Sequence, residues 1–187
     1  MTRLSHVVGI DDAPFDPAHR GDVTLVGAVF GAGRLEGVLC GRVRRDGRNA
    51  TGRIARLIGE SRFAAHLQVV LLQGITLAGF NVVDIHALHA TLGLPVIVVT
   101  RRRPDLAATR RALLDKVPGG ARKWRLIEAA GPVEPAGALF IQRAGIEHGR
   151  AATLVQRLAV NSLIPEPLRT AHLIAAGLAG GRTRQRV

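Results

Sequence analysis

Short apolar runs separated by polar and glycine-rich turns dominate the first part of the chain, and this pattern predicts strands. Residues 4–10 (LSHVVGI) form the first run and residues 22–30 (DVTLVGAVF) form the second. The glycines of GAGR at 31–34 predict a turn into a third strand at 35–44. The chain is therefore expected to begin with three antiparallel strands.

After residue 50 the pattern changes to alternating helices and strands. Ile54, Leu57 and Ile58 recur at helical spacing and predict a helix at 50–61. The further elements are expected to be strands at 67–72, 95–99 and 138–142, and helices at 82–92, 105–116, 121–130, 148–160 and 167–178. This order predicts an α/β fold with a mixed sheet, in which three antiparallel strands are followed by parallel strands, flanked by helices.

The length and composition of the chain favour one globular domain. A chain of 187 residues buries roughly 70% of the surface that it exposes when unfolded. We expect one domain over residues 1–180 and a basic tail over 181–187. No apolar run reaches the roughly 18 residues of a membrane span, and the single cysteine, Cys40, cannot form an internal disulfide. These features predict a cytoplasmic protein without a membrane partner.

Arginine supplies nearly all of the positive charge. The net charge is +12, from 26 basic and 14 acidic residues, and only Lys116 and Lys123 are lysines. A GC-rich genome produces the same bias, but the arginines also cluster, as they do in proteins that bind a phosphate backbone. The clusters are Arg42, Arg44, Arg45, Arg48, Arg53 and Arg56, then Arg101, Arg102 and Arg103, then Arg110 and Arg111, and finally Arg182, Arg184 and Arg186. An aromatic content of 3% argues against the reading of single strands by base stacking.

Polar side chains at two strand ends are candidates for a reactive site. Asp11 and Asp12 end the first strand, and Gln73 ends the run VVLL at 69–72. In α/β sheets, ligands bind beyond the carboxyl ends of central strands. Acids on neighbouring strands, about 4.8 Å apart, can share a divalent ion, and two such ions can clamp a phosphodiester. The alternative is structural, because Asp11 and Asp12 also suit an Asx-turn leading to Pro14.

Other polar residues have a structural and a functional interpretation. Pro167 suits the first position of the last helix, and His172 then lies at the edge of an apolar stripe, where a core position is the simpler explanation. Arg169, one turn earlier, can hold a phosphate bidentately.

Two asparagines are expected to cap helices. Asn49 precedes the helix at 50–61, and Asn81 precedes the helix at 82–92, with Asp84 in its first turn.

Five stretches, taken in order, resemble the endonuclease dU family. They are VVGIDDAPF, LLQGITLAGFNVVDI, GLPVIVVTRRRPD, FIQRAGI and IPEPLRTAH. The resemblance runs from about residue 4 to residue 180. That mainly archaeal family is similar to endonuclease V, which has a ribonuclease H-like fold and uses Mg²⁺ to nick strands near deaminated bases. The resemblance implies a ribonuclease H-like sheet and a metal-dependent endonuclease that repairs DNA containing deoxyuridine.

The resemblance carries over unevenly to the site residues. Asp11 matches the first-strand acid, and His172 matches a position that completes the metal site in some relatives. Gln73 stands where the family usually has aspartate. The stretch DGRNAT keeps Asp46 but has Asn49 near the place of a second acid. The resemblance thus implies Mg²⁺ or Mn²⁺ held by Asp11, Gln73, Asp46 and His172, and the two amides predict weak metal binding and impaired catalysis.

Two functions are consistent with these features. The first is a damage-specific endonuclease with Asp11, Asp12, Gln73 and His172 as catalytic residues. The second is a nuclease-like protein with a weak or inactive site that binds nucleic acid through its arginines. DNA is the expected partner in both, RNA is an alternative, and the sequence does not define an oligomeric state.

Two sets of residues are expected to contact the nucleic acid. The expected backbone contacts are Arg44, Arg45, Arg48, Arg101, Arg102, Arg103 and Arg169. A base pocket is expected at Gly74, Gly79 and Phe80, because the glycines permit close backbone approach and the phenylalanine can stack on a flipped base. The alternative for Phe80 is a place in the core.

Overall fold

The computed structural model describes residues 4–180, so the basic tail expected at 181–187 lies outside the described residues. The strands are β1 (His6–Asp12), β2 (Asp22–Gly31), β3 (Arg34–Arg44), β4 (Val69–Gln73), β5 (Thr76–Leu77), β6 (Asn81–Val82), β7 (Val96–Thr100), β8 (Glu134–Ala136) and β9 (Leu139–Ala144). The helices are α1 (Ala50–Gly59), α2 (Ile85–Leu92), α3 (Leu106–Lys116), α4 (Gly120–Ala129), α5 (His148–Leu158) and α6 (Glu166–Gly180).

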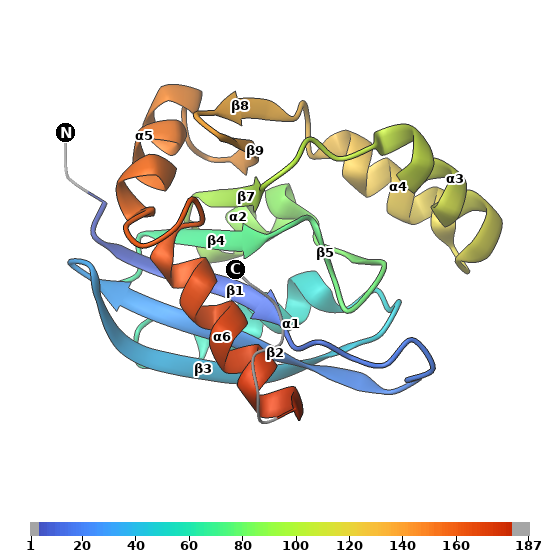
Figure 1. Cartoon of the computed structure of the whole chain (residues 1–187), viewed down its shortest axis with the longest axis horizontal. Coiled ribbons are helices and arrows are strands. Elements are labelled where there is room, and N and C mark those ends of the chain that lie inside the picture. The colour runs from blue at the N-terminus through green and yellow to red at the C-terminus, as the bar shows by residue number, and fades with distance from the viewer. Residues whose placement is uncertain (1–3, 181–187) are drawn as a thin grey trace.

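Seven strands form one mixed sheet in the order β3-β2-β1-β4-β7-β9-β8 (Figure 1). The first three strands are antiparallel neighbours, and β4 and β7 run parallel to β1. This confirms the predicted mixed α/β sheet. The strand expected at 138–142 is β9, and it runs antiparallel to β7. Its direction follows from the tight hairpin with β8, because a parallel neighbour would need a crossover connection.

Helices cover both faces of the sheet, with α5 and α6 on one face and α1 and α2 on the other (Figure 1). The side chains of β1 and β4 alternate between these layers. Val8, Ile10, Val70 and Leu72 are buried in the cluster that includes α1 and α2. Val7, Val69 and Leu71, which alternate with them, are buried in the cluster that includes α5. The helical hairpin α3–α4 projects beyond the end of the sheet to which β1, β4 and β7 point.

Gly9 allows the start of α6 to lie directly against β1. A β-carbon at this position would lie 2.3 Å from the carbonyl carbon of Pro167 and 2.6 Å from the amide nitrogen of Leu168. Both are backbone atoms, so they cannot turn away as a side chain does. The close approach positions the next turns of α6 over the carboxyl end of β1.

The helix start predicted at Asn81 is wrong. The helix α2 begins at Ile85, and Asp84 is its N-cap, since its carboxylate accepts a hydrogen bond from the Ala87 amide at 2.9 Å. Asn81 instead lies in β6, fully buried, where its side chain accepts from the Ala50 amide at 3.0 Å. The side-chain amide of Asn81 also donates to the Arg44 carbonyl at 2.8 Å.

Asn49 occupies the N-cap position of α1, as predicted, but its side chain makes no capping hydrogen bond. Its side-chain oxygen accepts from the Arg44 amide at 3.1 Å and from the Asn81 side chain at 2.8 Å. Asn81, which is 32 residues away, satisfies the first amide of α1 in its place.

Candidate functional site

Asp11 and His172 form the centre of the candidate site. Asp11 is the penultimate residue of β1 and is 5% exposed. His172 lies in the second turn of α6, and its Nδ1 is 2.8 Å from Oδ2 of Asp11. Burial raises the pKa of Asp11, and the hydrogen bond from His172 opposes that rise. The same hydrogen bond raises the pKa of His172. Sequence spacing favoured a core position for this histidine, whereas the structure pairs it with a strand-end acid.

Gln73 lies beside Asp11 on the neighbouring strand. The parallel register pairs Ile10 with Leu72, so Asp11 and Gln73 are the next residues along the two strands. Both therefore face the layer of α5 and α6. The side-chain oxygen of Gln73 is buried and has no hydrogen-bond partner within the described residues. A buried amide oxygen without a donor is rare and calls for a partner, such as water or a cation.

Asp12 adds a second carboxyl group at the same strand end. Burial raises its pKa to about 7, and the adjacent Asp11 carboxylate contributes to the rise, while a hydrogen bond from the Ala78 backbone opposes it. The Asp12 amide donates to Oδ1 of Asp11 at 2.9 Å. The strand end therefore holds two carboxyl groups and an imidazole, and burial raises the pKa of both carboxyl groups.

The carboxylate of Asp46, another expected metal ligand, already has two partners. Its Oδ1 accepts a hydrogen bond from the Phe80 amide at 2.8 Å, and its Oδ2 is 3.2 Å from Nε of Arg45. Within residues 4–180, no group of three or more His, Cys, Asp or Glu side chains is arranged to hold a metal ion. A divalent ion at this end of the sheet would depend on Asp11, Asp12, the amide oxygen of Gln73 and water.

Several of the arginines expected to bind nucleic acid already have partners. Arg169 donates from Nε and Nη2 to the carboxylate of Glu166 at 2.8–3.0 Å. Arg45 donates to the carbonyls of Pro17 and His19, and its guanidinium lies 5.4 Å from the ring centre of Phe15. Both arginines thus have partners within the protein, and their contact with nucleic acid stays a prediction.

The remaining predicted arginine contacts are exposed. Arg44 lies 3.7 Å from Asp22 in a solvent-exposed ion pair, and such pairs contribute little. Arg48 and the run Arg101–Arg103 are exposed, and the run directly follows β7 at the same end of the sheet as Gln73. Arg44, Arg48 and the run at 101–103 stay predictions.

The loop expected to form a base pocket is open at Gly74 but packed against the protein at Gly79 and Phe80. Gly74 and Gly79 have φ angles of +85° and +83°, which favour glycine. A β-carbon at Gly79 would lie 2.4 Å from Oδ1 of Asp46, whereas one at Gly74 would meet nothing closer than 4.0 Å. Phe80 packs against the small cluster of Val82, Leu113 and Ile127. This supports the core alternative for Phe80, and the open side of the loop is at Gly74.

Sequence reasoning did not single out Lys123 or the tertiary role of Asn81. Lys123 is 1% exposed, although lysine is rarely buried. A signal was present, because Gly120, Lys123 and Ile127 recur at helical spacing and form the buried face of α4. A lysine on an apolar helical stripe therefore indicates a buried positive charge.

The strand order, the mixed directions and the helices on both faces define a ribonuclease H-like fold. The family described as endonuclease dU matches residues 3–179, and the chain belongs to that family. A UPF0215 protein of Deinococcus radiodurans is 58% identical over 96% of this chain and 91% of its own. A UPF0215 protein of Methanothermobacter thermautotrophicus is 48% identical over 95% of this chain and 89% of its own.

Two solved structures illustrate the fold relationship. A crystal structure of a protein of unknown function from Archaeoglobus fulgidus has a TM-score of 0.88 and 33% identity, and the match covers 95% of this chain and 99% of that one. Endonuclease V of Ciona intestinalis, solved with DNA that contains inosine, has a TM-score of 0.57 and 14% identity, with coverages of 89% and 82%. The second similarity shows a shared fold.

No helix within the described residues is long and apolar enough to cross a membrane.

Proposed function

We propose that this protein is a divalent-metal-dependent endonuclease that cuts DNA containing deoxyuridine. The observation that supports it most directly is the pairing of Asp11 with His172 beside the donor-free oxygen of Gln73. The family description and the shared fold with endonuclease V support the same reaction class. RNA is the alternative substrate.

Asp11 and His172 have the geometry of a base and the residue that orients it. Because Asp11 bonds to Nδ1, it fixes the ring and leaves Nε2 to accept a proton from an attacking water. The raised pKa of His172 strengthens it as a base. Water attack on a phosphodiester needs such a proton acceptor. At the end of β1 this acceptor is His172, which Asp11 orients.

The donors at this strand end fit a weakly held Mg²⁺ or Mn²⁺. Oxygen ligands suit both ions, and Asp11, Asp12 and Gln73 present carboxylate or amide oxygens there, one of which has no donor. A bound ion would supply positive charge beside the phosphoryl oxygens on which negative charge accumulates. Only two of the donors carry charge, so we expect a higher metal requirement than for a site with three carboxylates.

The direct test uses purified protein with matched DNA duplexes that contain deoxyuridine, deoxyinosine or no lesion, together with an RNA of the same sequence. Each is incubated with Mg²⁺, with Mn²⁺ and with EDTA. We expect cleavage of the deoxyuridine duplex with metal, no cleavage in EDTA, and loss of cleavage in Asp11→Ala.

The alternative function predicts a different result. A nuclease-like binding protein would bind these nucleic acids in a salt-dependent manner and cut none of them with either metal. That outcome would contradict the endonuclease proposal. Equal cutting of all DNA substrates would contradict the preference for deoxyuridine, but it would still support nuclease activity.

A further inference from the structure

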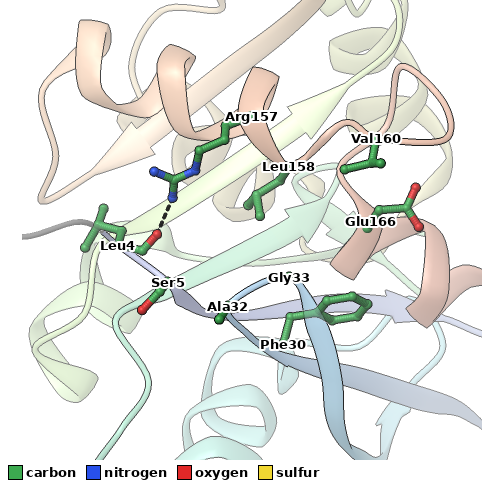
Figure 2. A pocket seen from close by; sticks show the side chains of 9 residues that line it. All are labelled: Leu4, Ser5, Phe30, Ala32, Gly33, Arg157, Leu158, Val160 and Glu166. Atoms are coloured by element: carbon green, nitrogen blue, oxygen red, sulfur yellow. Dashed lines mark hydrogen bonds between the residues drawn. The ribbon is translucent and has the colours of Figure 1, made fainter.

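Two pockets of similar size differ in how their charges are satisfied. One, of about 260 Å³, lies at the opposite end of β1 from the candidate site and is lined by apolar residues with Arg157 and Glu166 (Figure 2). Arg157 donates to the Leu4 carbonyl, and Glu166 is bonded to Arg169. Its charged groups therefore already have partners.

The second pocket, of about 210 Å³, is cationic. Gly47 and Arg48, the start of α1, the start of α2 and one side of α4 line it. Its basic residues are Arg48, Arg122 and Lys123, and its acidic residue is Asp84. The Asp84 carboxylate already accepts the hydrogen bond that caps α2. We call this the α1–α4 pocket.

Lys123 makes this pocket unusual. It is 1% exposed, and its ammonium group donates a hydrogen bond to the Asp46 carbonyl, a neutral acceptor. An ammonium group has three donors. Burial lowers the pKa of Lys123, the charge of Asp46 opposes this, and the nearby positive charge of Arg48 lowers the pKa further. A buried cation beside another cation is stabilised by a bound anion.

Other residues that line the α1–α4 pocket add further hydrogen-bond donors. Arg48 and Arg122 are exposed, and no ion pair joins either of them to a carboxylate within the described residues. Thr51 lies in the first turn of α1, and its hydroxyl accepts from the Asp84 amide, so its own hydrogen can be donated. The N-terminus of α1 contributes the positive end of its dipole.

The α1–α4 pocket connects to the candidate site through residues 78–80. Asp46, whose carbonyl accepts from Lys123, also accepts from the Phe80 amide and donates its own amide to the Ala78 carbonyl at 2.9 Å. The Ala78 backbone in turn bonds to the Asp12 carboxyl group. An anion in the pocket and a phosphodiester at Asp11 would thus lie on either side of one short stretch of chain.

We propose that the α1–α4 pocket binds a backbone phosphate of the nucleic acid strand that reaches the candidate site, and so anchors that strand. This inference rests on the proposed function. A tetrahedral phosphate oxyanion matches the chemistry present, since arginine forks, an ammonium and a hydroxyl all donate to phosphate oxygens.

The test measures binding of a fluorescent deoxyuridine duplex by anisotropy, in EDTA and over a range of salt concentrations. Arg48→Gln and Arg122→Gln each remove one exposed pocket cation, and Arg125→Gln removes an exposed arginine of α4 that does not line the pocket. We expect each pocket variant to weaken binding about 10-fold and to reduce the slope of log affinity against log salt by about 0.9. The Arg125→Gln control should change affinity less than about two-fold.

A second arm uses inorganic phosphate as the probe. At constant ionic strength, phosphate should raise the melting temperature of wild type and of Arg125→Gln, and this rise should disappear in Lys123→Met. Lys123→Met keeps the length of the side chain and removes the buried charge, and its melting curve without phosphate shows whether it folds.

The outcomes separate the pocket from the proposed reaction. Pocket variants that bind DNA like Arg125→Gln would overturn the inference, even if wild type cuts DNA. Phosphate stabilisation without any effect on DNA binding would also overturn it, in favour of a site for free phosphate. Weakened binding in the pocket variants would support it, even if wild type cuts nothing and the endonuclease proposal fails.

Discussion

Two clusters of like charge are linked through one short stretch of chain, residues 78–80, because Asp12 bonds to the Ala78 backbone and Lys123 bonds to Asp46, which in turn bonds to the backbone of residues 78 and 80. One is acidic, with Asp11 and Asp12 at the end of β1, and the other is the cationic α1–α4 pocket. In the acidic cluster, burial raises the pKa of both carboxyl groups, the charge of Asp11 raises the pKa of Asp12 further, and His172 opposes both rises. In the cationic pocket, burial and repulsion lower the pKa of Lys123, which has a neutral carbonyl as its acceptor.

The difference shows what each cluster lacks. The acidic strand end has its histidine but also a donor-free amide oxygen, so it is suited to a proton, water or a cation. The cationic pocket has hydrogen-bond donors in excess of its acceptors, so it is suited to an anion. Hydrolysis of a phosphodiester needs both kinds of site: one that holds the reacting groups and one that holds the nucleic acid backbone in position.

Asp11→Asn is expected to have the largest effect on activity. The change removes the charge that orients and stabilises protonated His172 and one of two charged metal donors, so cleavage should fall by about 10²–10⁴-fold. Cleavage of the deoxyuridine duplex measures this. Because the replacement also removes a buried charge next to Asp12, the melting temperature should not fall, and a large fall would instead indicate a structural role.

Gly9→Ala is expected to be the most destabilising of these substitutions. The new methyl group would collide with the backbone at Pro167 and Leu168, and overpacking of this kind costs about 1–3 kcal/mol or more. Displacement of α6 should also separate His172 from Asp11, so the pKa of His172 in an NMR titration should return toward 6.5. In the control, Gly41→Ala, the nearest atom lies at an ordinary 3.5 Å, and stability should be preserved.

Gln73→Asp tests whether the acidic cluster is limited by its missing charge. A carboxylate beside Asp11 should bind a divalent ion more tightly, so half-maximal cleavage should need roughly 10-fold less Mg²⁺. Gln73→Asn shortens the side chain equally without adding charge and serves as the control. An identical metal requirement in both variants would show that the missing charge does not limit the site.

A last expected effect is a pH dependence of stability set by Asp12. The folded protein keeps this proton to about pH 7, whereas in the unfolded chain the same carboxyl group has its ordinary pKa of 3.8. The folded state therefore binds more protons over that range, and stability falls as pH rises from about 4 to about 7. The raised pKa of His172 acts in the same direction, since its stabilisation is lost as pH rises above 6.5 and through the folded pKa.

Thermal unfolding in EDTA between pH 4.5 and pH 8.5 measures this dependence. Asp12→Asn should melt above wild type at pH 8 and near it at pH 4.5. Parallel curves over the whole range would contradict a raised pKa at Asp12.

Much of the fold followed from periodicity, because strands and helices impose spacings of two and 3.6 residues on buried positions. The pattern located the strand end at Asp11 and Asp12, the neighbouring end at Gln73 and the last helix at Pro167. It misplaced the start of α2, because Asn81 and Asp84 are both good caps, and a tertiary contact with Ala50 decided between them.

The polar partners that lie far apart in the sequence were decided by the tertiary structure alone. Asp11 meets His172 across 161 positions, and Lys123 meets Asp46 across 77. The sequence by itself determined which residue types stand at the strand ends and on which helical stripe, since burial of apolar side chains has a period. A hydrogen bond between distant side chains has no such period in the sequence. Only the tertiary structure therefore decided which acid pairs with histidine, which lysine is buried and which oxygen has no donor.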